Sequence, residues 1–480
     1  MILIMKFDFA TSLFLGCTCL PMSISALEKD ADGYCLISNA EDLLEYCKNS
    51  NNTVLNGRLT SDIDLSSTVG KINGEIVTIS SVYSPNSSFD GCGHTISNYY
   101  GESPLFDNIN RIDNLIIKNA YIKGALYSSV SGFVKKAKVM NNCHFEGVVI
   151  GNSGGRVYSL TQGCDTIINC SNYGICYGET ECYLMSGTYY ENCYNRGDLR
   201  GYFNYTTILD DCNFAYNIYN SGKSTNYTSL INDWSSVSNC YMLETPEYQP
   251  EMEGVNYVEI KQFKNGSVTD SLNKYVTNNP LSKNNIKLLP WVQGEDGFPR
   301  FEHVDLQPTQ GHLVKFIGVY QDKLVALNGK IDLPKSSDPM YDFDFNGWDG
   351  TGIDKDTTIT VSCIFNTDLE QDVDGYYLIH NIDELMTYTK YAEKDLPINV
   401  RLTTDLDLSS VCGKIDGKNV NWTPIKAKNS IFDGAGHTIS NLYICDPIMS
   451  YRYGRKNVSK KSFFDEVLGV ENLTIKKSFC

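Results

Sequence analysis

Positive charge is scarce in this 480-residue sequence. It carries 40 lysines and arginines against 57 aspartates and glutamates, which gives a formal net charge of −17 and an isoelectric point near 4.8. A protein that binds nucleic acid needs a clustered basic surface to neutralise phosphates, and this balance does not supply one. We therefore expect no nucleic-acid partner.

Long apolar stretches are also lacking. A helix that spans a bilayer needs about 20 apolar residues, and no segment reaches that length. The stretch from Phe9 to Leu20 follows Lys6 and precedes a run of small residues that ends at Ala26. A charged start, a short apolar region and small residues are typical of a signal peptide. The sequence thus predicts a signal peptide over residues 1–26, no transmembrane segment, and a secreted or cell-surface protein.

Sequence motifs of metal chemistry are missing as well. None of the six histidines belongs to a His-Glu-x-x-His motif, which argues against a zincin protease. No pair of cysteines two residues apart follows the signal peptide, so a structural zinc site is not expected. From motifs of this kind we predict no catalytic, cofactor-binding or metal-binding residue.

The cysteines follow a repeated context. Two of the 17 lie in the signal peptide, so 15 remain, an odd number that cannot all pair internally. Several of them come directly after Asn or Asp, which a disulfide network does not explain and a stacked repeat does. We predict that these cysteines occupy equivalent positions on successive coils, mostly without bridges: Cys143, Cys170, Cys193, Cys212 and Cys240.

A long segment of the chain occurs twice. Asp32 to Lys118 recurs as Asp374 to Lys476, and the block from Phe89 to Asn98 matches Phe432 to Asn441 at nine of ten positions. Each copy opens with Asp-Gly-Tyr, a short strand and a helix-like stretch, which is Ala40 to Lys48 in the first copy and Ile382 to Glu393 in the second. Such similarity within one chain indicates one folding unit used twice.

Apolar residues elsewhere in the unit come in pairs and triples separated by Asn, Gly, Asp and Ser. Short strands at intervals of about 20 to 28 residues favour a parallel stack in which each coil buries its inward side chains against the previous one. The fold class expected is all-β: a right-handed parallel β-helix with an N-terminal capping helix that covers the first edge.

The Asp-Gly-Tyr-x-Leu-Ile-x-Asn opening, the Phe-Asp-Gly-x-Gly-His-Thr-Ile-Ser block and the Ile-x-Asn-Cys-x-Asn-x-Gly coils resemble bacterial surface proteins with GLUG-type repeats. The resemblance covers residues 32–301 and 374–480, and implies a secreted, β-helical, adhesin-like protein. Phe263 to Phe301 resembles the segment that closes such rods. Residues 310–367 alternate differently, include Gly347-Trp348, and are similar to the β-grasp-like repeats of internalins, which implies a spacer.

Two groups of polar residues are candidates for a chemical role. His94 and His437 share an Asp-Gly-x-Gly-His-Thr context, which we interpret as a structural turn and not as a catalytic pair. Three aspartate pairs are weak candidates for calcium ligands or acid–base groups: Asp62 with Asp64, Asp405 with Asp407, and Asp210 with Asp211.

Tyrosines are concentrated in the later coils. They can form an aromatic strip that contacts sugar or protein, or they can face inward and stack. The candidate binding surface consists of Tyr183, Tyr189, Tyr190, Tyr194, Tyr202 and Tyr205.

The expected function is a non-enzymatic exported cell-surface or adhesin-like protein whose rod binds glycans or extracellular proteins. The alternative is a carbohydrate-active β-helix enzyme, a polysaccharide lyase or hydrolase. Carboxylates grouped with lysine or arginine in one groove favour the enzyme, and a smooth face of Tyr, Asn and Thr favours the binding protein. The second copy stops near Lys476 without further coils, so we also expect a fragment of a longer protein that associates through an open β-helix edge.

Overall fold

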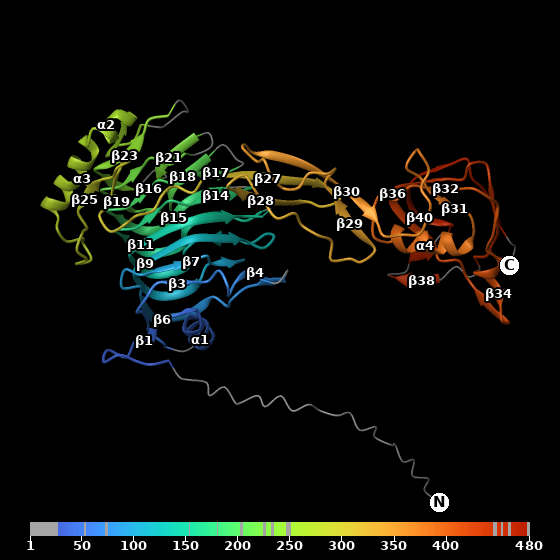
Figure 1. Ribbon diagram of the computed structural model, residues 1–480, viewed down its shortest axis with the longest axis horizontal. Helices are drawn as coiled ribbons and strands as arrows, with labels where there is room; N and C mark the ends of the chain where they lie inside the picture. The colour runs from blue at the N-terminus through green and yellow to red at the C-terminus, as the bar shows by residue number, and fades with distance from the viewer. Residues whose placement is uncertain are drawn as a thin grey trace, which may run out of the picture. The chain divides into compact units, whose positions relative to one another are not determined.

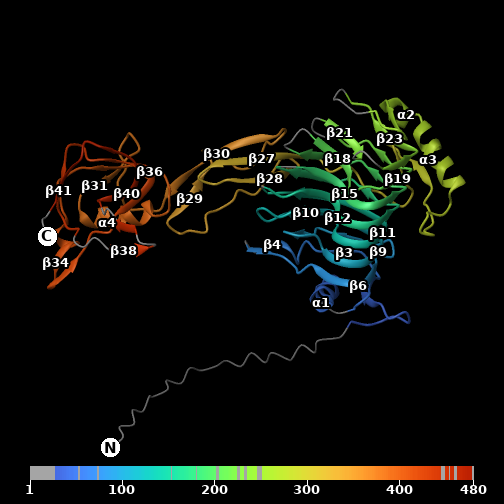
Figure 2. The ribbon, with the colours of Figure 1, turned by 180° about the vertical axis from the view of Figure 1, so that it is seen from behind.

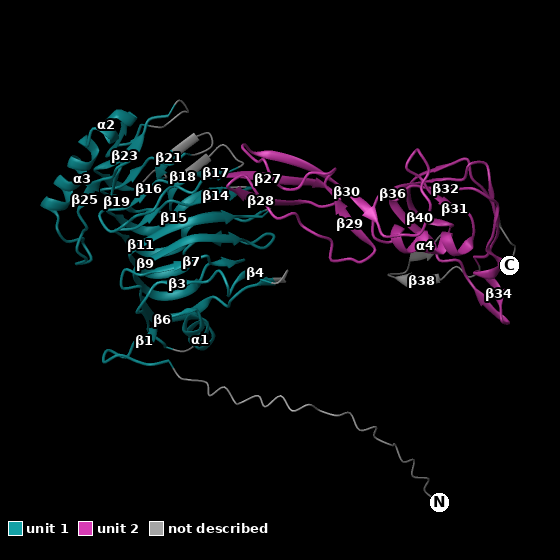
Figure 3. Cartoon of the chain, viewed as in Figure 1, with its two compact units in different colours: residues 1–310 teal, residues 311–480 magenta. Residues whose placement is uncertain are grey.

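The computed structural model divides the chain into two compact units, residues 1–310 and 311–480 (Figure 3). The predicted signal peptide lies outside the described residues. Those residues are 27–51, 54–72, 75–152, 154–179, 181–201, 205–223, 227–231, 235–245, 251–444, 449–452, 455–458 and 462–477.

The first unit is built on one large parallel sheet. Its strands stack in rows that begin beside helix α1 (Ala40–Ser50) and continue to β23 (Cys240–Leu243) (Figure 1). Its strands are β1 Cys35–Ile37, β2 Gly57–Leu59, β3 Ile63–Asp64, β6 Val82–Asp90, β7 Thr95–Ser97, β8 Tyr100–Gly101, β9 Phe106–Lys123, β10 Val130–Ser131, β11 Val134–Ile150, β12 Val157–Ile168, β13 Ser171–Asn172, β14 Ile175–Gly178, β15 Cys182–Glu191, β16 Tyr194–Asn195, β17 Leu199–Gly201, β18 Tyr205–Asp210, β19 Phe214–Tyr216, β20 Tyr219–Asn220, β21 Tyr227–Ile231, β22 Ser236–Ser238, β23 and β24 Val255–Val258. A small antiparallel pair, β4 (Gly70–Ile72) and β5 (Glu75–Val77), projects from it.

Each strand pairs in parallel with a strand one coil further along the chain. β9 pairs with β11, β11 with β12, and β12 with β15. The register places apolar side chains above one another in columns, and the column of Phe89, Ile112, Met140, Ile167 and Tyr190 is fully buried. The expectation of an all-β chain with a large parallel sheet is confirmed.

Asparagines form the corners of the coils. The corner residues have positive φ values of 51° to 57°, a left-handed conformation that Asn adopts more readily than other side chains do. They are Asn114, Asn142, Asn169, Asn192, Asn217 and Asn239. This conformational need explains why Asn precedes so many of the cysteines.

The predicted cysteine column is correct except at one coil. His144 pairs with Ser171, and Ser171 with Tyr194, which aligns the preceding cysteines Cys143, Cys170 and Cys193. Tyr194 pairs with Tyr219 and Tyr219 with Tyr241, so the following coils contribute Ile218 and Cys240. Cys212 is not in the column, because it follows Asp211, another left-handed residue at a different corner. All thirteen described cysteines are free.

The helix α1 covers the first end of the stack, as predicted. Its N-cap is Asn39, whose side chain accepts a hydrogen bond from the backbone N–H of Asp42. Tyr46 on its inner face is fully buried and its ring lies 5.5 Å from that of Phe89. The helix therefore shields the edge that the first coil would otherwise leave open.

A closing segment, residues 260–306, lies along one side of the stack (Figure 2). It comprises α2 (Ile260–Lys264), α3 (Ser267–Asn278) and the antiparallel pair β25 (Trp291–Gln293) and β26 (Pro299–Phe301). Trp291 and Phe301 are buried against Tyr194 and Tyr219 of the stack, so the segment covers the outer face of these coils.

The second unit begins with a four-stranded sheet in the order β28-β27-β30-β29. Its strands are β27 Gly311–Gly318, β28 Asp322–Leu327, β29 Tyr341–Asp344 and β30 Thr357–Phe365. It has an apolar core of its own, centred on Val314, Phe316 and Val361.

The repeated segment follows in the same unit and has its own core around Phe432. It comprises β31 Tyr377–Ile379, α4 Ile382–Ala392, β32 Val400–Leu402, β33 Leu406–Asp407, a 3-10 helix Leu408–Ser410, β34 Gly413–Ile415, β35 Lys418–Val420, β36 Ile425–Asp433, β37 Thr438–Leu442, β38 Met449–Arg452, β39 Arg455–Val458, β40 Phe464–Glu471 and β41 Thr474–Lys477. The helix predicted here is present, with Asn381 as N-cap.

Candidate binding groove

The predicted tyrosine strip is not an exposed surface. Tyr183, Tyr189, Tyr190 and Tyr194 have 0 to 7% of their surface exposed. Tyr202 lies outside the described residues, as does the side chain of Tyr205. For the four that are described, the prediction of an outward-facing strip is wrong.

Three of these tyrosines are buried for different reasons. Tyr190 belongs to the interior column and donates its hydroxyl hydrogen to the carbonyl of Asp210. Tyr194 does face outward, but the closing segment covers it. Tyr183 stacks on Tyr158 with ring centroids 5.1 Å apart. The chain itself thus covers the aromatic face that the sequence predicts as a binding surface.

The two histidine turns are equivalent. His94 Nδ1 lies 3.2 Å from Asp62 Oδ1, and His437 Nδ1 lies 3.3 Å from Asp405 Oδ1. In both copies the same carboxylate oxygen accepts the backbone N–H of the next threonine, at 2.9 and 2.8 Å. The aspartate of the previous coil therefore holds each turn in place, in keeping with a structural role.

The aspartate pairs are already engaged by protein donors. Asp64 accepts a hydrogen bond from Asn98 Nδ2 at 2.6 Å. Asp210 is buried and accepts the hydroxyl hydrogen of Tyr158 at 3.1 Å, while burial and the neighbouring Asp211 raise the pKa of its carboxyl. Across the described ranges, no group of three or more His, Cys, Asp or Glu is placed to hold a metal ion.

An arginine joins three segments at the start of each repeat. Arg58 contacts Asp30, lies 3.4 Å from Asp32 and 3.8 Å from Asp90, and stacks on Tyr34 at 4.2 Å. The guanidinium lies among the carboxylates of the Asp-x-Asp-Gly-Tyr opening, where it balances their charge. In the second copy Arg401 makes the same contacts with Asp372, Asp374, Asp433 and Tyr376.

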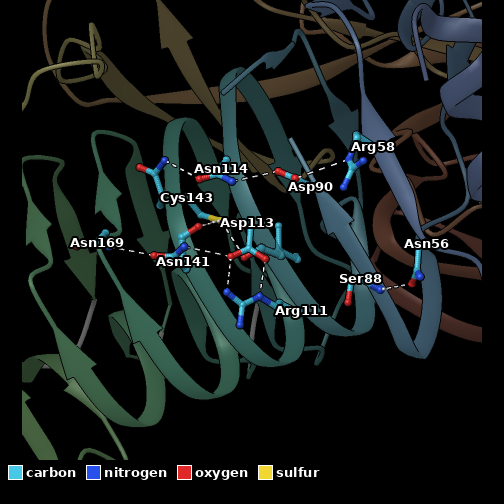
Figure 4. A network of polar contacts seen from close by, with 12 residues as sticks. Asn56, Arg58, Ser88, Asp90, Arg111, Asp113, Asn114, Asn141, Cys143 and Asn169 are labelled. Carbon is cyan, nitrogen blue, oxygen red and sulfur yellow. Dashed lines mark hydrogen bonds and ion pairs between the residues drawn. The ribbon is translucent and has the colours of Figure 1, made fainter. Parts of the chain in front are cut away.

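Two rows of polar side chains run along the stack, one beginning at Arg58 and Asp90 and the other at Arg111 and Asp113 (Figure 4). In one, Asn114 donates to Asp90 at 3.1 Å and Asn142 donates to Asn114 at 3.0 Å. In the other, Asn141 donates to Asp113 at 3.0 Å and Asn169 donates to Asn141 at 2.9 Å. The second row continues through Asn192, Asn217 and Asn239, each donating to the previous member at 2.6 to 2.7 Å. The donors and acceptors of these side-chain amides are used in hydrogen bonds to one another, which indicates a structural role.

Another sequence motif lies between β11 and β12. Residues 151–155 read Gly-Asn-Ser-Gly-Gly, which matches the Gly-x-Ser-x-Gly pattern of serine hydrolases. That pattern requires a turn from a strand into a helix, whereas residues 151–155 connect β11 to β12. Ser153 itself lies outside the described residues.

The first unit has an open groove of about 380 Å³ that runs across successive coils, here called the coil groove. Its lining residues lie on β6, β9, β11, β12 and β15, apart from Asp211, which follows β18: Pro85, Asn108, Ile109, Lys136, Ala137, Lys138, Gln162, Gly163, Cys164, Asp165, Ser186, Gly187, Thr188 and Asp211. Because these residues come from neighbouring coils, the groove crosses the strands and follows the direction of stacking.

Small side chains create the groove. Ile109, Ala137, Cys164 and Gly187 stand in register on four successive strands, and the last three have smaller side chains than the first. A Cβ atom on Gly187 would lie 1.9 Å from the carbonyl oxygen of Cys164, so a side chain there would displace the neighbouring strand. Gly163 differs, because the nearest atom to a Cβ there is 3.9 Å away. The hollow at Gly163 is therefore open to a ligand.

Polar groups of both charges line the coil groove. Lys136, Lys138, Asp165 and Asp211 are exposed. Asp211 accepts the hydroxyl hydrogen of Ser186 at 3.4 Å. Within the described part of the chain, the side-chain oxygen of Gln162 is buried and has no hydrogen-bond partner.

An aromatic hollow of about 450 Å³ continues the coil groove and shares Asp165 and Thr188 with it. It is lined further by Thr166, Tyr189, Phe214, Lys283 and Asn284. Phe214 is 38% exposed, so its ring is available for contact. Of the four predicted tyrosines whose side chains the structure describes, Tyr189 reaches this hollow, with its ring centroid 6.2 Å from that of Phe214.

Sequence reasoning missed most of these groove residues. Gly163 and Gly187 carry the clearest signal, since a glycine within a strand often marks the close approach of another chain or a ligand. The sequence does not indicate that Lys283 lines the aromatic hollow, because the position of Lys283 depends on how the closing segment packs against the coils. Carboxylates and lysines share the coil groove, an arrangement that favours a polysaccharide-degrading enzyme as the alternative function.

No helix in the described part of the chain has the length and apolar character needed to cross a membrane.

No protein-family model matches the sequence, and no curated protein matches it. Among solved structures, the chain is similar to one described as a putative immunoglobulin A1 protease from Bacteroides ovatus, with 15% sequence identity and a TM-score of 0.41. The match covers 58% of this chain and 94% of that one, a likeness too weak to assign a fold or an activity.

Proposed function

We propose that this protein is exported, is displayed at the cell surface in the manner of an adhesin, and binds glycans in the coil groove. The observation that carries the proposal is the groove itself, an open channel that crosses successive coils and presents lysine, carboxylate, amide and hydroxyl groups. Sites for sugars and other small ligands combine a concave surface with a few such polar groups and an aromatic wall.

The proposal includes the fold and family suggested by the sequence. The parallel stack with Asn corners and a capping helix is the arrangement expected of a right-handed β-helix with GLUG-type repeats. The apolar stretch before residue 27 accounts for export. A stiff rod with a groove along its length suits an extended polymer, because equivalent positions recur at the coil spacing of about 4.8 Å.

A glycan array with the purified chain tests this proposal, and Gly163→Leu provides the sharpest variant. A side chain at Gly163 meets no atom closer than 3.9 Å, so leucine should fill the groove without straining the strand. We expect the variant to lose at least tenfold in affinity for whichever glycan the chain binds. Gly469→Leu is the matched control, since Gly469 lies on a strand of the second unit and also has room, with its nearest atom at 3.7 Å.

A polysaccharide-degrading enzyme is the second candidate. Asp165 and Asp211 line one groove together with Lys136, and paired carboxylates are the usual acid and base of glycoside hydrolysis. The release of new reducing ends from a bound polysaccharide, abolished by Asp165→Asn or Asp211→Asn with binding retained, would replace the binding function by this one. Binding without cleavage by the unmodified chain would support the binding protein.

A further inference from the structure

Three lysines in the groove lack an acidic partner. Lys136, Lys138 and Lys283 line the coil groove and the aromatic hollow, and no described carboxylate forms an ion pair with any of them. The adjacent Lys135, by contrast, lies 3.1 Å from Asp107. In a chain with a net charge of −17, positive charge is therefore left unpaired inside a groove.

The Lys283 ammonium is held in place by aromatic rings. Its Nζ lies 4.6 Å from the centre of the Tyr216 ring and 5.1 Å from that of Phe214, and it donates a hydrogen bond to the Tyr216 hydroxyl at 3.0 Å. The negative faces of the rings attract the cation without neutralising it. An ammonium has three N–H donors, so Lys283 keeps donors for a ligand.

Phe214 lies beside this ammonium with part of its ring exposed to the hollow. Aromatic rings offer a flat apolar surface, and the ring C–H groups of a sugar can pack on it. Asp165 and Thr188, at the junction with the coil groove, add an acceptor and a hydroxyl for the sugar's hydroxyl groups. The aromatic hollow thus combines a stacking ring, a cation and hydroxyl partners.

We propose that the groove recognises an anionic glycan, with one sugar ring packed on Phe214 and its acidic group bound by Lys283. Lys136 and Lys138, on an earlier strand of the same groove, receive acidic groups of other sugar units. This inference rests on the proposed glycan-binding function and adds the class of ligand. A uronate carboxylate and a sulfate ester share the chemistry that the lysines recognise.

The test compares the affinities of the full chain for four probes of equal length: an oligouronate, its carboxyl-reduced counterpart, a sulfated neutral oligosaccharide, and the unsulfated form. We expect at least tenfold tighter binding of an anionic probe than of its neutral counterpart, and a loss of this preference at high salt. The oligouronate and sulfated arms identify which acidic group is preferred. Equal affinity for charged and neutral forms would overturn this inference while leaving glycan binding intact, and no binding to any probe or array glycan would overturn both.

Single substitutions test which side chains cause the preference for anionic over neutral probes. Lys283→Gln should remove most of the preference and keep binding to the neutral probe, whereas Phe214→Ala should weaken both probes by about tenfold. Lys261→Gln is the matched control, because Lys261 lies in the same closing segment, is 71% exposed at its side chain and pairs with Glu259 outside the groove. A Lys283→Gln variant that keeps the full preference would contradict the assignment.

Discussion

Trp291 donates its indole N–H to the side-chain oxygen of Asn192 at 2.7 Å, and both side chains are buried. The same oxygen accepts a hydrogen bond from Asn217 at 2.7 Å, and the Asn192 amide nitrogen donates to Asn169 and to the Leu289 carbonyl. Asn192 therefore links the corner asparagines of successive coils to the closing segment.

Replacing Asn192 should destabilise the first unit strongly. Asn192→Ala leaves the buried indole N–H of Trp291 and the amide of Asn217 without acceptors, and each orphaned buried group costs about 1–3 kcal/mol. We expect a loss of about 3 kcal/mol or more in the free energy of unfolding, measured by urea denaturation. Asn285→Ala is the control, because Asn285 has nearly the same positive φ of 56° but an exposed side chain. Similar losses in both variants would show that backbone conformation, and not the hydrogen bonds, explains the effect.

The stability of the first unit should decrease on mild acidification. Burial lowers the pKa of His144 well below its usual value, with a smaller contribution from His303. His144 is fully buried and lies 2.9 Å from Asn142 Oδ1 and 2.8 Å from Ser171 Oγ, contacts that suit a neutral ring. Its stabilising effect is complete above the unfolded pKa of about 6.5 and is lost as the pH falls toward the folded pKa, at up to about 1.4 kcal/mol per pH unit.

Thermal unfolding of the chain between pH 7.5 and pH 5 measures this dependence. His144→Asn removes the titrating ring, so the slope of stability against pH should become smaller in this interval even if the variant is less stable overall. An unchanged slope would show that His144 does not carry the dependence. A substitution of His312 in the second unit is the control, because the His312 ring is partly exposed and not buried.

The two types of cysteine should respond differently to serine. Cys193 is fully buried in the interior column, where a hydroxyl would be poorly accommodated, and we expect Cys193→Ser to cost about 1–3 kcal/mol. Cys212 lies outside that column and is only partly buried, so Cys212→Ser should cost less than half as much. Urea denaturation of both variants checks the corrected register, and equal losses would favour the original column that included Cys212.

The repeated blocks show what could be read from the sequence. Asp-Gly-Tyr, the helix and the Gly-x-Gly-His turn could be predicted because they depend on local turn and cap geometry, and Asn39 and Asn381 cap their helices in the same way. The cysteine column was correct where the Asn corner recurs at the same place in the coil. It failed at Cys212 because a second left-handed residue, Asp211, imitates that corner.

The coil groove could not be predicted from the sequence, because it depends on how distant segments of the chain pack together. Tyr194 looked like a binding residue because its strand places it outward, yet the closing segment, more than 60 residues later, covers it. Phe214 is a single aromatic residue with no distinguishing sequence context, and its partner Lys283 comes from that same distant segment. Which outward face stays open depends on where the chain folds back, and short-range patterns do not encode that choice.

The last prediction concerns the second copy of the repeated unit, which exposes apolar residues that the first copy buries. Val470 pairs with Phe432 in the second copy as Ile112 pairs with Phe89 in the first. Val470 is 44% exposed, whereas Ile112 is fully buried beneath the next coil. Ile475 is likewise 39% exposed, while its counterpart Ile117 is fully buried.

Burying a side chain of this size contributes roughly 1.5–3 kcal/mol to the free energy of unfolding. The second copy lacks part of this contribution at each apolar residue that stays exposed. We therefore expect residues 374–477 to be less stable than residues 32–301. Limited proteolysis of the full chain, followed by mass spectrometry, should show cleavage of the C-terminal module first and a resistant N-terminal fragment. The same digestion at increasing protein concentration distinguishes protection by self-association, which depends on concentration, from intrinsic stability, which does not. Equal resistance of both modules in a chain shown to be monomeric would contradict the prediction, because the exposed Val470 and Ile475 would then carry no cost.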